Sequence, residues 1–255
     1  MIVGILQARM ASTRLPEKVL MPLAGLPMLA RQTERLQRAG RIDRLIVATT
    51  VNPQDDAIAS LAAELGIDSF RGSEEDVLDR FFRAAALHSP SHVVRLTADC
   101  PLADWTLIDR VVDFAMSGKF DYATNTLRPT WPDGLDVEVM TFAALEAAWR
   151  DAQSPVEREH VTQFLVKHPE RFSQGSLEGD VDLSAMRWTV DEPRDYEFVS
   201  QIYDALYRHN PAFTTDDILE LLRQRPELME INSGIERNEG LRLSIEQYLK
   251  ELPGE

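Results

Sequence analysis

The chain has 255 residues, of which 42 are acidic and 27 basic, so its formal net charge is -15. This acidic balance argues against general binding of nucleic acid, because phosphate backbones need a basic face. Since no apolar run reaches 18 residues and the start lacks the layout of a signal peptide, we expect no membrane span. A single cysteine, Cys100, rules out an internal disulfide framework and predicts a cytoplasmic protein.

The first half of the chain alternates strand and helix patterns. Apolar runs predict strands at residues 2–6, 44–50, 67–72 and 92–102. Amphipathic periodicity predicts helices at residues 27–40, 55–66, 73–88 and 105–116. Alternation at this spacing is typical of parallel strands that are joined by right-handed crossovers. We therefore expect an α/β fold with a Rossmann-like, mostly parallel sheet flanked by helices.

The second half is less regular. We expect strands at residues 121–126, 135–140 and 186–193, helices at 141–152 and 156–168, and a helical pattern from Pro193 onward. No internal repeat or clear linker divides the chain, so we predict one domain, residues 1–255. It comprises a nucleotide-binding half (1–120), an embedded subregion for substrate and dimer contacts that includes the late strand (121–192), and a helical C-terminal part (193–255).

A basic loop follows the first predicted strand. Arg9, Arg14 and Lys18 lie close together there, with the hydroxyl of Ser12 between them. Arginine offers forked hydrogen bonds and lysine a point charge, so the loop suits a polyphosphate. Neither a Walker loop nor a GxGxxG fingerprint is present. From charge alone, a surface loop whose basic residues pair with the excess acid is an equally good interpretation.

Two aspartates stand at the ends of distant apolar runs. Asp99 follows VVRLTA, and Asp191 follows MRWTV. In open parallel sheets, ligands bind beyond the carboxyl ends of the strands. Mg²⁺ takes one or two carboxylates together with phosphate oxygens and water, so this pair beside a basic loop is a candidate metal site. Taken singly, each aspartate could instead cap a helix.

The segment NTLRPTWPDGLDVEV offers polar groups for a polyhydroxylated ligand: Asn125, Arg128, Asp136 and Glu138. Asp136 and Glu138 share one strand face, which could equally be a solvated face of an edge-like strand. Asp133 lies in a Pro-Asp-Gly turn, and we interpret it as a turn former.

The segment EREHV adds two candidates for a substrate carboxylate, Arg158 and His160. Residues two apart do not face the same way on a helix, so we expect only one of them to serve. Asp76 and Arg80 could form an i,i+4 ion pair or contact the ligand. Cys100 is interpreted as a small buried hydrophobe.

Several segments together resemble one family of enzymes. They are LQARMASTRLPEKVL, ATTVNPQDDAI, FRGSEEDVLDRF, RLTADCPL, PDGLDVEV, EREHV and RWTVDEPRDYEF. The residues of these segments, and the order of the segments along the chain, are similar to those of the cytidylyltransferases that make CMP-KDO and CMP-neuraminate. The resemblance is closest to the branch called spore coat polysaccharide biosynthesis protein F, which INSGIERNEG near the C-terminus also resembles. It implies a fold like that of the nucleotide-diphospho-sugar transferases.

By this resemblance, Arg9, Ser12, Arg14 and Lys18 would hold the triphosphate of CTP, and Asp99 and Asp191 would hold Mg²⁺. Arg9, Lys18, Asp99 and Asp191 would be the catalytic set. The pyrimidine would lie near five further residues, Leu6, Ala8, Arg71, Gly72 and Ser73. The family generally has glycine where this chain has Glu17, which places an added negative charge beside the loop. Related enzymes are commonly homodimers, with the contact near residues 135–140.

The resemblance implies a Mg²⁺-dependent transfer of CMP from CTP to a sugar acid or related acidic polyol, with release of pyrophosphate, in the synthesis of surface polysaccharide or glycoconjugate. Two alternatives stay open: a nucleotidyltransferase acting on sugar phosphates, and a non-catalytic nucleotide-binding protein on the same fold. The sequence leaves undecided which acceptor is used, whether CTP or UTP is read, and which group is the general base.

Overall fold

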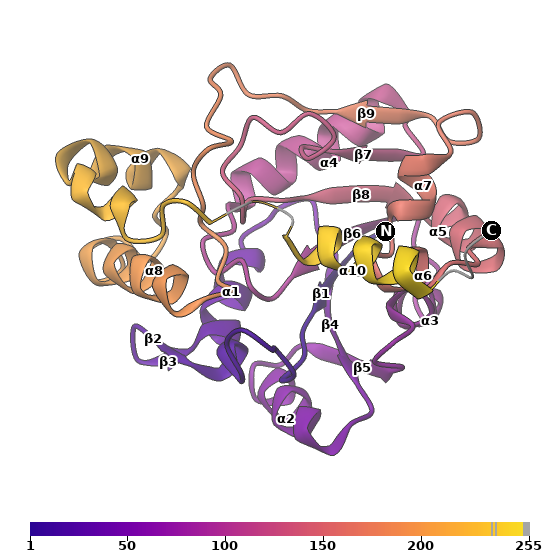
Figure 1. Cartoon of the computed structure of the whole chain (residues 1–255), viewed down its shortest axis with the longest axis horizontal. Helices are drawn as coiled ribbons and strands as arrows, with labels where there is room; N and C mark the ends of the chain where they lie inside the picture. The colour runs from indigo at the N-terminus through magenta and orange to yellow at the C-terminus, as the bar shows by residue number, and fades with distance from the viewer. Residues whose placement is uncertain (236, 238, 252–255) are drawn as a thin grey trace.

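A seven-stranded sheet forms the centre of the computed structural model, which describes residues 1–235, 237 and 239–251 (Figure 1). The strand order is β5-β4-β1-β6-β8-β7-β9. The strands are β1 (Ile2–Gln7), β4 (Arg44–Thr50), β5 (Asp68–Gly72), β6 (His92–Thr97), β7 (Tyr122–Thr124), β8 (Glu138–Thr141) and β9 (Gln174–Ser176). The four strands of the first half pair in parallel, as predicted, whereas β8 runs antiparallel to both of its neighbours.

Helices cover both faces of the sheet because successive strand residues point to opposite sides. Ile2 and Leu6 of β1 belong to one hydrophobic cluster, and Val3 and Ile5 belong to the other. The first cluster takes in residues of α1 (Met28–Leu36), α2 (Asp56–Glu64), α4 (Trp105–Gly118), α8 (Pro193–Leu206) and α9 (Thr215–Gln224). The second takes in residues of α3 (Val77–Ala86), α5 (Phe142–Asp151) and α7 (Gln163–Lys167).

The remaining elements are short or lie outside these layers. A two-stranded hairpin and three 3-10 helices complete the connections: β2 (Pro22–Leu23), β3 (Leu26–Pro27), η1 (Lys18–Leu20), η2 (Pro53–Asp55) and η3 (Pro226–Glu230). The last helix, α10 (Glu239–Glu251), packs on α6 (Pro155–Glu159). Residues 236, 238 and 252–255 of the predicted helical C-terminal part lie outside the described residues.

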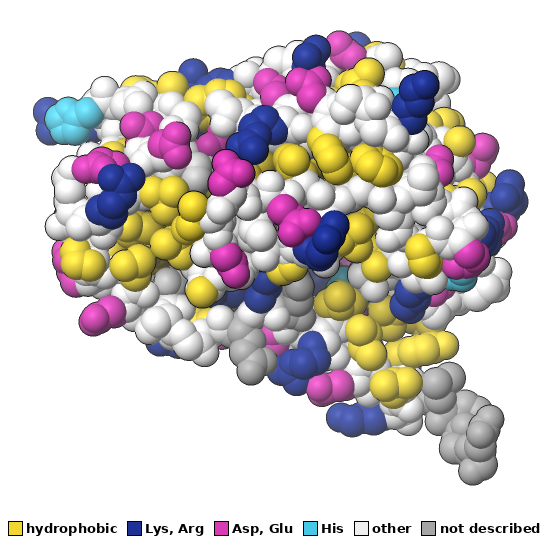
Figure 2. Space-filling model, turned by 90° about the horizontal axis from the view of Figure 1, so that it is seen from above, with side chains coloured by type: hydrophobic (Ala, Val, Ile, Leu, Met, Phe, Trp, Pro, Cys, Tyr) yellow, Lys and Arg dark blue, Asp and Glu magenta, His cyan; other side chains and the backbone are white. Residues whose placement is uncertain are grey.

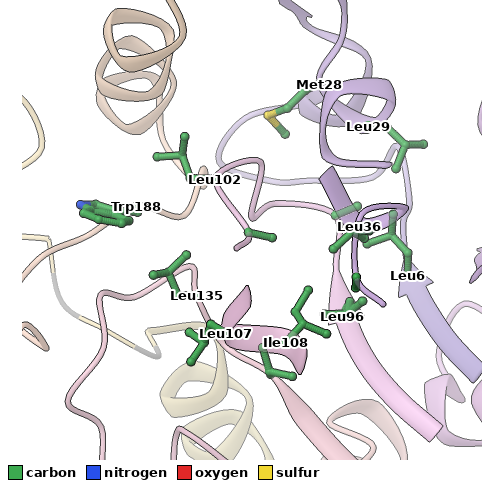
Figure 3. Packing of buried hydrophobic residues seen from close by; sticks show 14 of the residues in the cluster. Leu6, Met28, Leu29, Leu36, Leu96, Leu102, Leu107, Ile108, Leu135 and Trp188 are labelled. Carbon is green, nitrogen blue, oxygen red and sulfur yellow. The ribbon is translucent and has the colours of Figure 1, made fainter. Parts of the chain in front are cut away.

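The predicted late strand at residues 186–193 is wrong, because only one β-bridge forms there, between Asp133 and Arg187. The segment instead runs extended between two loops, with Trp188 N–H donating to Asp133 O and Val190 N–H donating to Asp99 O. Trp188 is buried and lies in the core with Leu102 and Leu135 (Figure 3). These contacts fix the position of Asp191, which directly follows Val190.

The strand predicted at residues 135–140 is found in part, as β8, but its expected edge position is wrong, because β8 lies inside the sheet, hydrogen-bonded to β6 and β7. β8 begins only at Glu138, since the side chain of Asn125 binds the preceding backbone: its amide donates to Leu135 O and accepts from Val137 N–H. The edges of the sheet are β5 and β9. A homodimer stays a prediction, but a contact through a free edge of residues 135–140 is ruled out.

One long helix was predicted at residues 156–168, and two short ones, α6 and α7, are found. The break falls at Val161, whose φ of 46° lies in the left-handed region. A β-branched residue rarely adopts this conformation, and such strain is concentrated at functional sites. Arg158 lies within α6, whereas His160 is the residue after its end and directly precedes the break.

The surface seen in Figure 2 carries side chains of both charge signs interspersed with hydrophobic ones. Within the described part of the chain, no helix combines the length and apolarity that crossing a membrane requires.

Substituting Gly134 tests the close approach that fixes the Asp133 loop. Its φ is 103°, and a Cβ there would lie 2.4 Å from Thr189 N. We expect Gly134→Ala to lower the free energy of unfolding by about 3 kcal/mol, from overpacking and left-handed strain together. The measurement is chemical denaturation. Gly66→Ala is the control, because Gly66 has φ 69° and open space around it, so only strain of about 1 kcal/mol is expected. Equal losses in the two variants would contradict this account.

Candidate functional site

The opening loop, residues 8–17, is held in shape by backbone contacts at both ends. Ala8 N–H donates to Ala48 O, which extends the pairing of β1 with β4. Met10 N–H donates to the fully buried carboxylate of Asp55 at 2.7 Å. Glu17 N–H then donates to Met10 O at 3.1 Å and closes the loop. The loop therefore delivers Lys18 to a fixed place beyond the end of β1.

Lys18 joins the two aspartates that the sequence analysis singled out. Its Nζ lies 3.2 Å from Asp99 Oδ2 and 2.9 Å from Asp191 Oδ1, and it donates to Val190 O at 2.7 Å. Burial alone would lower the pKa of Lys18, but the two carboxylates raise it above its ordinary value. Three residues from distant parts of the chain thus form one charged centre, which we call the Lys18 clamp (Lys18, Asp99 and Asp191).

The electrostatics of the clamp favour the ionised carboxylate. Burial opposes ionisation of Asp99, but the ammonium of Lys18 outweighs it and lowers the pKa of Asp99 to about 2. The neighbouring Cys100 is buried, and burial together with the Asp99 charge raises the pKa of its thiol well above the usual range. Cys100 is therefore a neutral thiol at pH 7, in line with its interpretation as a small buried residue.

Two arginines neutralise the outer oxygen of Asp191. Arg14 Nη2 lies 3.2 Å from Asp191 Oδ2, and Arg187 Nη2 lies 3.0 Å from the same atom. Arg187 is also paired with Asp133 and Asp195 at 2.9 Å each. Neither Arg187 nor Asp195 was predicted from the sequence, and Asp133 was predicted only as a turn former. A basic residue inside the apolar run MRWTV was the available signal for Arg187.

A cavity of about 530 Å³ opens beside the clamp, and Asp99, Asp191 and Arg14 form part of its wall. The predicted substrate residues Asp136, Glu138 and His160 line the same cavity. Glu138 is buried, accepts a hydrogen bond from Tyr122 Oη at 2.8 Å and pairs with Arg95. Neither Glu138 nor Asp136 therefore lies on a solvated face of an edge strand.

His160 and Arg158 face different cavities, as the rule for residues two apart predicts. His160 Nε2 has no hydrogen-bond partner among the described residues, and burial lowers the pKa of this imidazole. Arg158 is tied to Asp76 by Nε at 3.0 Å and by Nη2 at 2.5 Å. It lines a second, more open cavity of about 750 Å³ with Arg9 and Glu74.

Arg80 does not pair with Asp76, because its guanidinium turns to the backbone oxygen of Ser73. The side chain is fully buried, and its Nε and Nη2 have no partner within the described part of the chain. Burial lowers the pKa of Arg80 to about 10. Asp76 instead caps α3 by accepting from Asp79 N–H and pairs with Arg158.

The structure leaves several predicted residues outside the two cavity walls. Asn125 is buried in the contacts described above, and Arg128 is exposed and lies 3.2 Å from Glu178. Both positions favour a structural or surface role over contact with a ligand in these cavities. Arg71 donates to Thr50 O and Asn52 O, so it braces the loop after β4.

The other predicted nucleotide residues lie near the ends of the first strands. Leu6 and Ala8 are buried along β1 and its extension, and Gly72 ends β5. The hydroxyl of Ser12 accepts from Leu15 N–H at 3.3 Å, and that of Ser73 accepts from Asp76 N–H at 3.0 Å. Both hydroxyls therefore serve local turns.

The clamp suits a divalent cation by the chemistry of its donors. Two carboxylates already converge on one positive charge, the Lys18 ammonium. Across the described residues, no group of three or more His, Cys, Asp or Glu side chains gathers as a metal-binding set. Two carboxylates are nevertheless enough for Mg²⁺, because phosphate oxygens and water can supply its other ligands.

Comparison with known proteins relates this site to a family. A family model described as cytidylyltransferase matches residues 3–233. The spore coat polysaccharide biosynthesis protein SpsF of Bacillus subtilis is 32% identical over 235 residues, which cover 89% of this chain and 95% of that protein. A 3-deoxy-manno-octulosonate cytidylyltransferase of Anaeromyxobacter dehalogenans is 31% identical over 235 residues, which cover 84% and 93%.

A solved structure agrees with these relatives. The cytidylyltransferase from Leptospira borgpetersenii superposes with a TM-score of 0.87 at 31% identity, over 92% of this chain and 99% of that one. The likeness therefore extends to the arrangement of the whole sheet, and it confirms the resemblance that the sequence motifs indicated.

The pH dependence of stability tests the Lys18 clamp. Because Lys18 holds the pKa of Asp99 at about 2, below the usual value near 4, ionised Asp99 stabilises the fold above pH ~4, and this stabilisation is lost as the pH falls through 2. We expect the loss of unfolding free energy between pH 7 and pH 2 to be about 2 kcal/mol smaller in Asp99→Asn. Asp113→Asn, at an exposed residue, is the control. The same pH dependence in Asp99→Asn and wild type would rule out the clamp.

Glu17 tests the shape of the loop. Its φ of 60° is left-handed, it is exposed, and it makes no ion pair among the described residues. Glycine at this position should therefore relieve strain, and we expect Glu17→Gly to raise the free energy of unfolding by about 0.5 kcal/mol after the entropic cost of glycine. Glu17→Gln removes only the charge and should leave stability unchanged in denaturant titrations. A gain in Glu17→Gln that equals that of Glu17→Gly would assign the effect to charge.

Proposed function

The chain belongs to the cytidylyltransferase family of nucleotidyltransferases, and we propose that it transfers CMP from CTP to a hydroxyl of a sugar acid or related acidic polyol. The observation that carries this proposal is the Lys18 clamp, in which a buried ammonium and two carboxylates meet beside a polar cavity. The spore coat and octulosonate relatives support a role in the synthesis of polysaccharide or glycoconjugate. The homodimer and the cytoplasmic location stay predictions.

The opening loop would hold the triphosphate. Arg14 and Lys18 are positioned by carboxylates, with Nη1 of Arg14 2.6 Å from Glu239 and Lys18 within the clamp. A polyphosphate is a stronger anion than these carboxylates, so both cations can exchange their partners for phosphate oxygens. Arg9 lies on the other side of the loop, exposed and 3.7 Å from Glu74, where it faces the second cavity. Ser12 would offer its hydroxyl between them.

Asp99 and Asp191 would hold a divalent cation, which we propose is Mg²⁺. Bound there, such an ion neutralises phosphate charge and polarises a phosphoryl oxygen. The protein's own contribution is positive charge beside both carboxylates: Lys18 lowers the pKa of Asp99, and Arg14 and Arg187 form ion pairs with Asp191.

In the proposed reaction the acceptor hydroxyl attacks the α-phosphorus and gives up its proton to solvent, a new O–P bond forms, and the bond to pyrophosphate breaks. Such a displacement requires in-line positioning and neutralised charge more than covalent help from the protein. Arg14 and Lys18 would hold the phosphates in line, and the wall of the 530 Å³ cavity would hold the acceptor. The proposed catalytic set is Arg9, Lys18, Asp99 and Asp191, and Arg14 is a further residue that would bind the phosphates.

For the acceptor we propose Asp136 and Glu138 as partners of its hydroxyls and His160 as a donor to its carboxylate. His160 lines the cavity next to the clamp, and because burial lowers its pKa the neutral ring keeps one N–H to donate. Arg158 is the weaker candidate, since Asp76 and Trp149 O already occupy its guanidinium. The second cavity, between Arg9 and Arg158, would then face the nucleoside part of CTP.

Removing the Asp99 carboxylate tests the proposed function. We expect Asp99→Ala to reduce pyrophosphate release from CTP and Mg²⁺ by at least about 100-fold. The reason is that the variant would no longer hold the cation that neutralises the charge of the triphosphate. The assay screens sugar acids, 3-deoxy-manno-octulosonate among them, with UTP in parallel. Asp113→Ala, at an exposed carboxylate on α4, should keep full activity, and circular dichroism should show both variants folded.

Near-normal turnover in Asp99→Ala would contradict the proposed role of the clamp. Stabilisation of the wild type by CTP and Mg²⁺, without pyrophosphate release on any acceptor, would favour a nucleotide-binding protein that does not catalyse. Faster release with sugar phosphates than with sugar acids would favour the other class of nucleotidyltransferase.

A further inference from the structure

The C-terminal segment reaches the mouth of the 530 Å³ cavity. We call its described residues 237 and 239–241 the strap; Glu239 and Leu241 line the cavity wall. Asn232 fixes the start of this segment, because its side-chain amide donates to Arg187 O at 2.9 Å and to Asp195 Oδ1 at 3.0 Å. The strap includes the first turn of α10, and Figure 1 shows α10 beside α6. The family model ends at residue 233, so the strap lies beyond the matched region.

Ion pairs join the strap to both sides of the cavity. Glu239 Oε2 lies 2.6 Å from Nη1 of Arg14 in the opening loop. Arg237 donates from Nη2 to Asp136 Oδ1 at 2.5 Å and from Nη1 to Trp131 O at 3.0 Å. The Arg237 side chain is only 16% exposed, so these contacts are shielded from water. The strap therefore bridges the phosphate loop and the proposed acceptor wall.

Asp136 depends on Arg237 for its charge. Two carboxylates face it, those of Asp133 and Glu138, and both disfavour its ionisation. Of the two cations near it, Arg95 is already paired with Glu138, whereas Arg237 binds Asp136 directly. Burial is the largest influence and raises the pKa of Asp136 to about 7, against the lowering effect of Arg237.

One oxygen of Asp136 is available to a ligand. Oδ1 accepts from Arg237, and Oδ2 has no hydrogen-bond partner among the described residues, although the side chain lines the cavity and is 29% exposed. A carboxylate held on one oxygen by a forked guanidinium presents the other in a fixed direction. A fixed carboxylate oxygen of this kind can accept a hydrogen bond from a hydroxyl of a sugar.

We propose that Arg237 is a positioning residue for the acceptor: it holds Oδ1 of Asp136 on the cavity wall, so that the free oxygen Oδ2 binds an acceptor hydroxyl. The inference rests on the proposed function for the identity of the ligand, but the link between Arg237 and Asp136 is a property of the protein alone. Arg237 lies beyond the matched residues 3–233, so this proposal places part of acceptor selection in a segment outside that match.

The first test follows Asp136 directly, without any ligand. In protein labelled with ¹³C at the aspartate carboxyl, the resonance of Asp136 is assigned by its loss in Asp136→Asn and titrated by NMR from pH 5 to pH 9. We expect Arg237→Gln to raise the pKa of Asp136 by about one pH unit, because an opposite charge is removed. Arg237→Lys should restore most of the wild-type titration. Arg242→Gln removes the same charge from α10, where Arg242 pairs with Glu246, and should change nothing.

The second test uses the acceptor that gives the fastest pyrophosphate release in the screen described above. We expect Arg237→Gln to raise the KM for that acceptor roughly tenfold at pH 7 and to leave the KM for CTP unchanged. In the wild type this acceptor KM should fall as the pH rises through about 7, and in Arg237→Gln the fall should move to higher pH.

The outcomes separate the inference from the proposed function. An unchanged titration of Asp136 in Arg237→Gln would overturn the inference, whichever reaction the protein catalyses. So would a KM that rises equally for CTP and for the acceptor, because that pattern indicates a general disturbance of the site. A shifted titration in a protein that releases no pyrophosphate with any acceptor would support the link between the two residues and contradict the proposed function.

Discussion

The buried ammonium of Lys18 connects three segments that are far apart in the sequence. Its Nζ donates hydrogen bonds to Asp99, which follows β6, and to Val190 O and Asp191, which lie at the end of the extended segment that starts at Arg187. Buried charges are costly unless paired, so the positions of the three segments are coupled. The parallel sheet makes this meeting feasible, because β1 and β6 are neighbours and their carboxyl ends lie at the same edge. The cavity and the strap both depend on where this centre stands.

An acidic protein with a basic loop poses an apparent conflict, which the structure resolves through alternating charges. Arg14 and Lys18 are each paired with carboxylates, and Arg187 and Arg237 extend the pairing through Asp133 and its neighbours. The cations of the loop pair with acidic side chains, as the surface-loop interpretation predicts. The polyphosphate interpretation stays a prediction, in which a triphosphate would exchange those carboxylate partners for phosphate oxygens.

The sequence predicted the features that depend on local periodicity and strand ends. The parallel first half follows from alternating patterns, and Asp99 lies just beyond the end of β6, as predicted. Asp191 meets Lys18 for a reason that the sequence did not predict, because it follows an extended segment and not a strand. The sequence did not predict features that depend on contacts between distant residues. The side chain of Asn125 moves the start of β8 to Glu138. The left-handed backbone at Val161, which no local pattern indicates, divides one predicted helix. Arg187 was missed for the same reason, because its partner Asp133 is 54 residues away.

A crystal structure with Mn²⁺ and a non-hydrolysable CTP analogue tests the central claim most directly. The anomalous signal of Mn²⁺ locates the ion independently of the fold. We predict that the ion contacts the carboxylates of both Asp99 and Asp191, and that Lys18 Nζ has turned to a phosphate oxygen. An ion bound elsewhere, with Lys18 still between the two carboxylates and the phosphates away from the opening loop, would contradict the account.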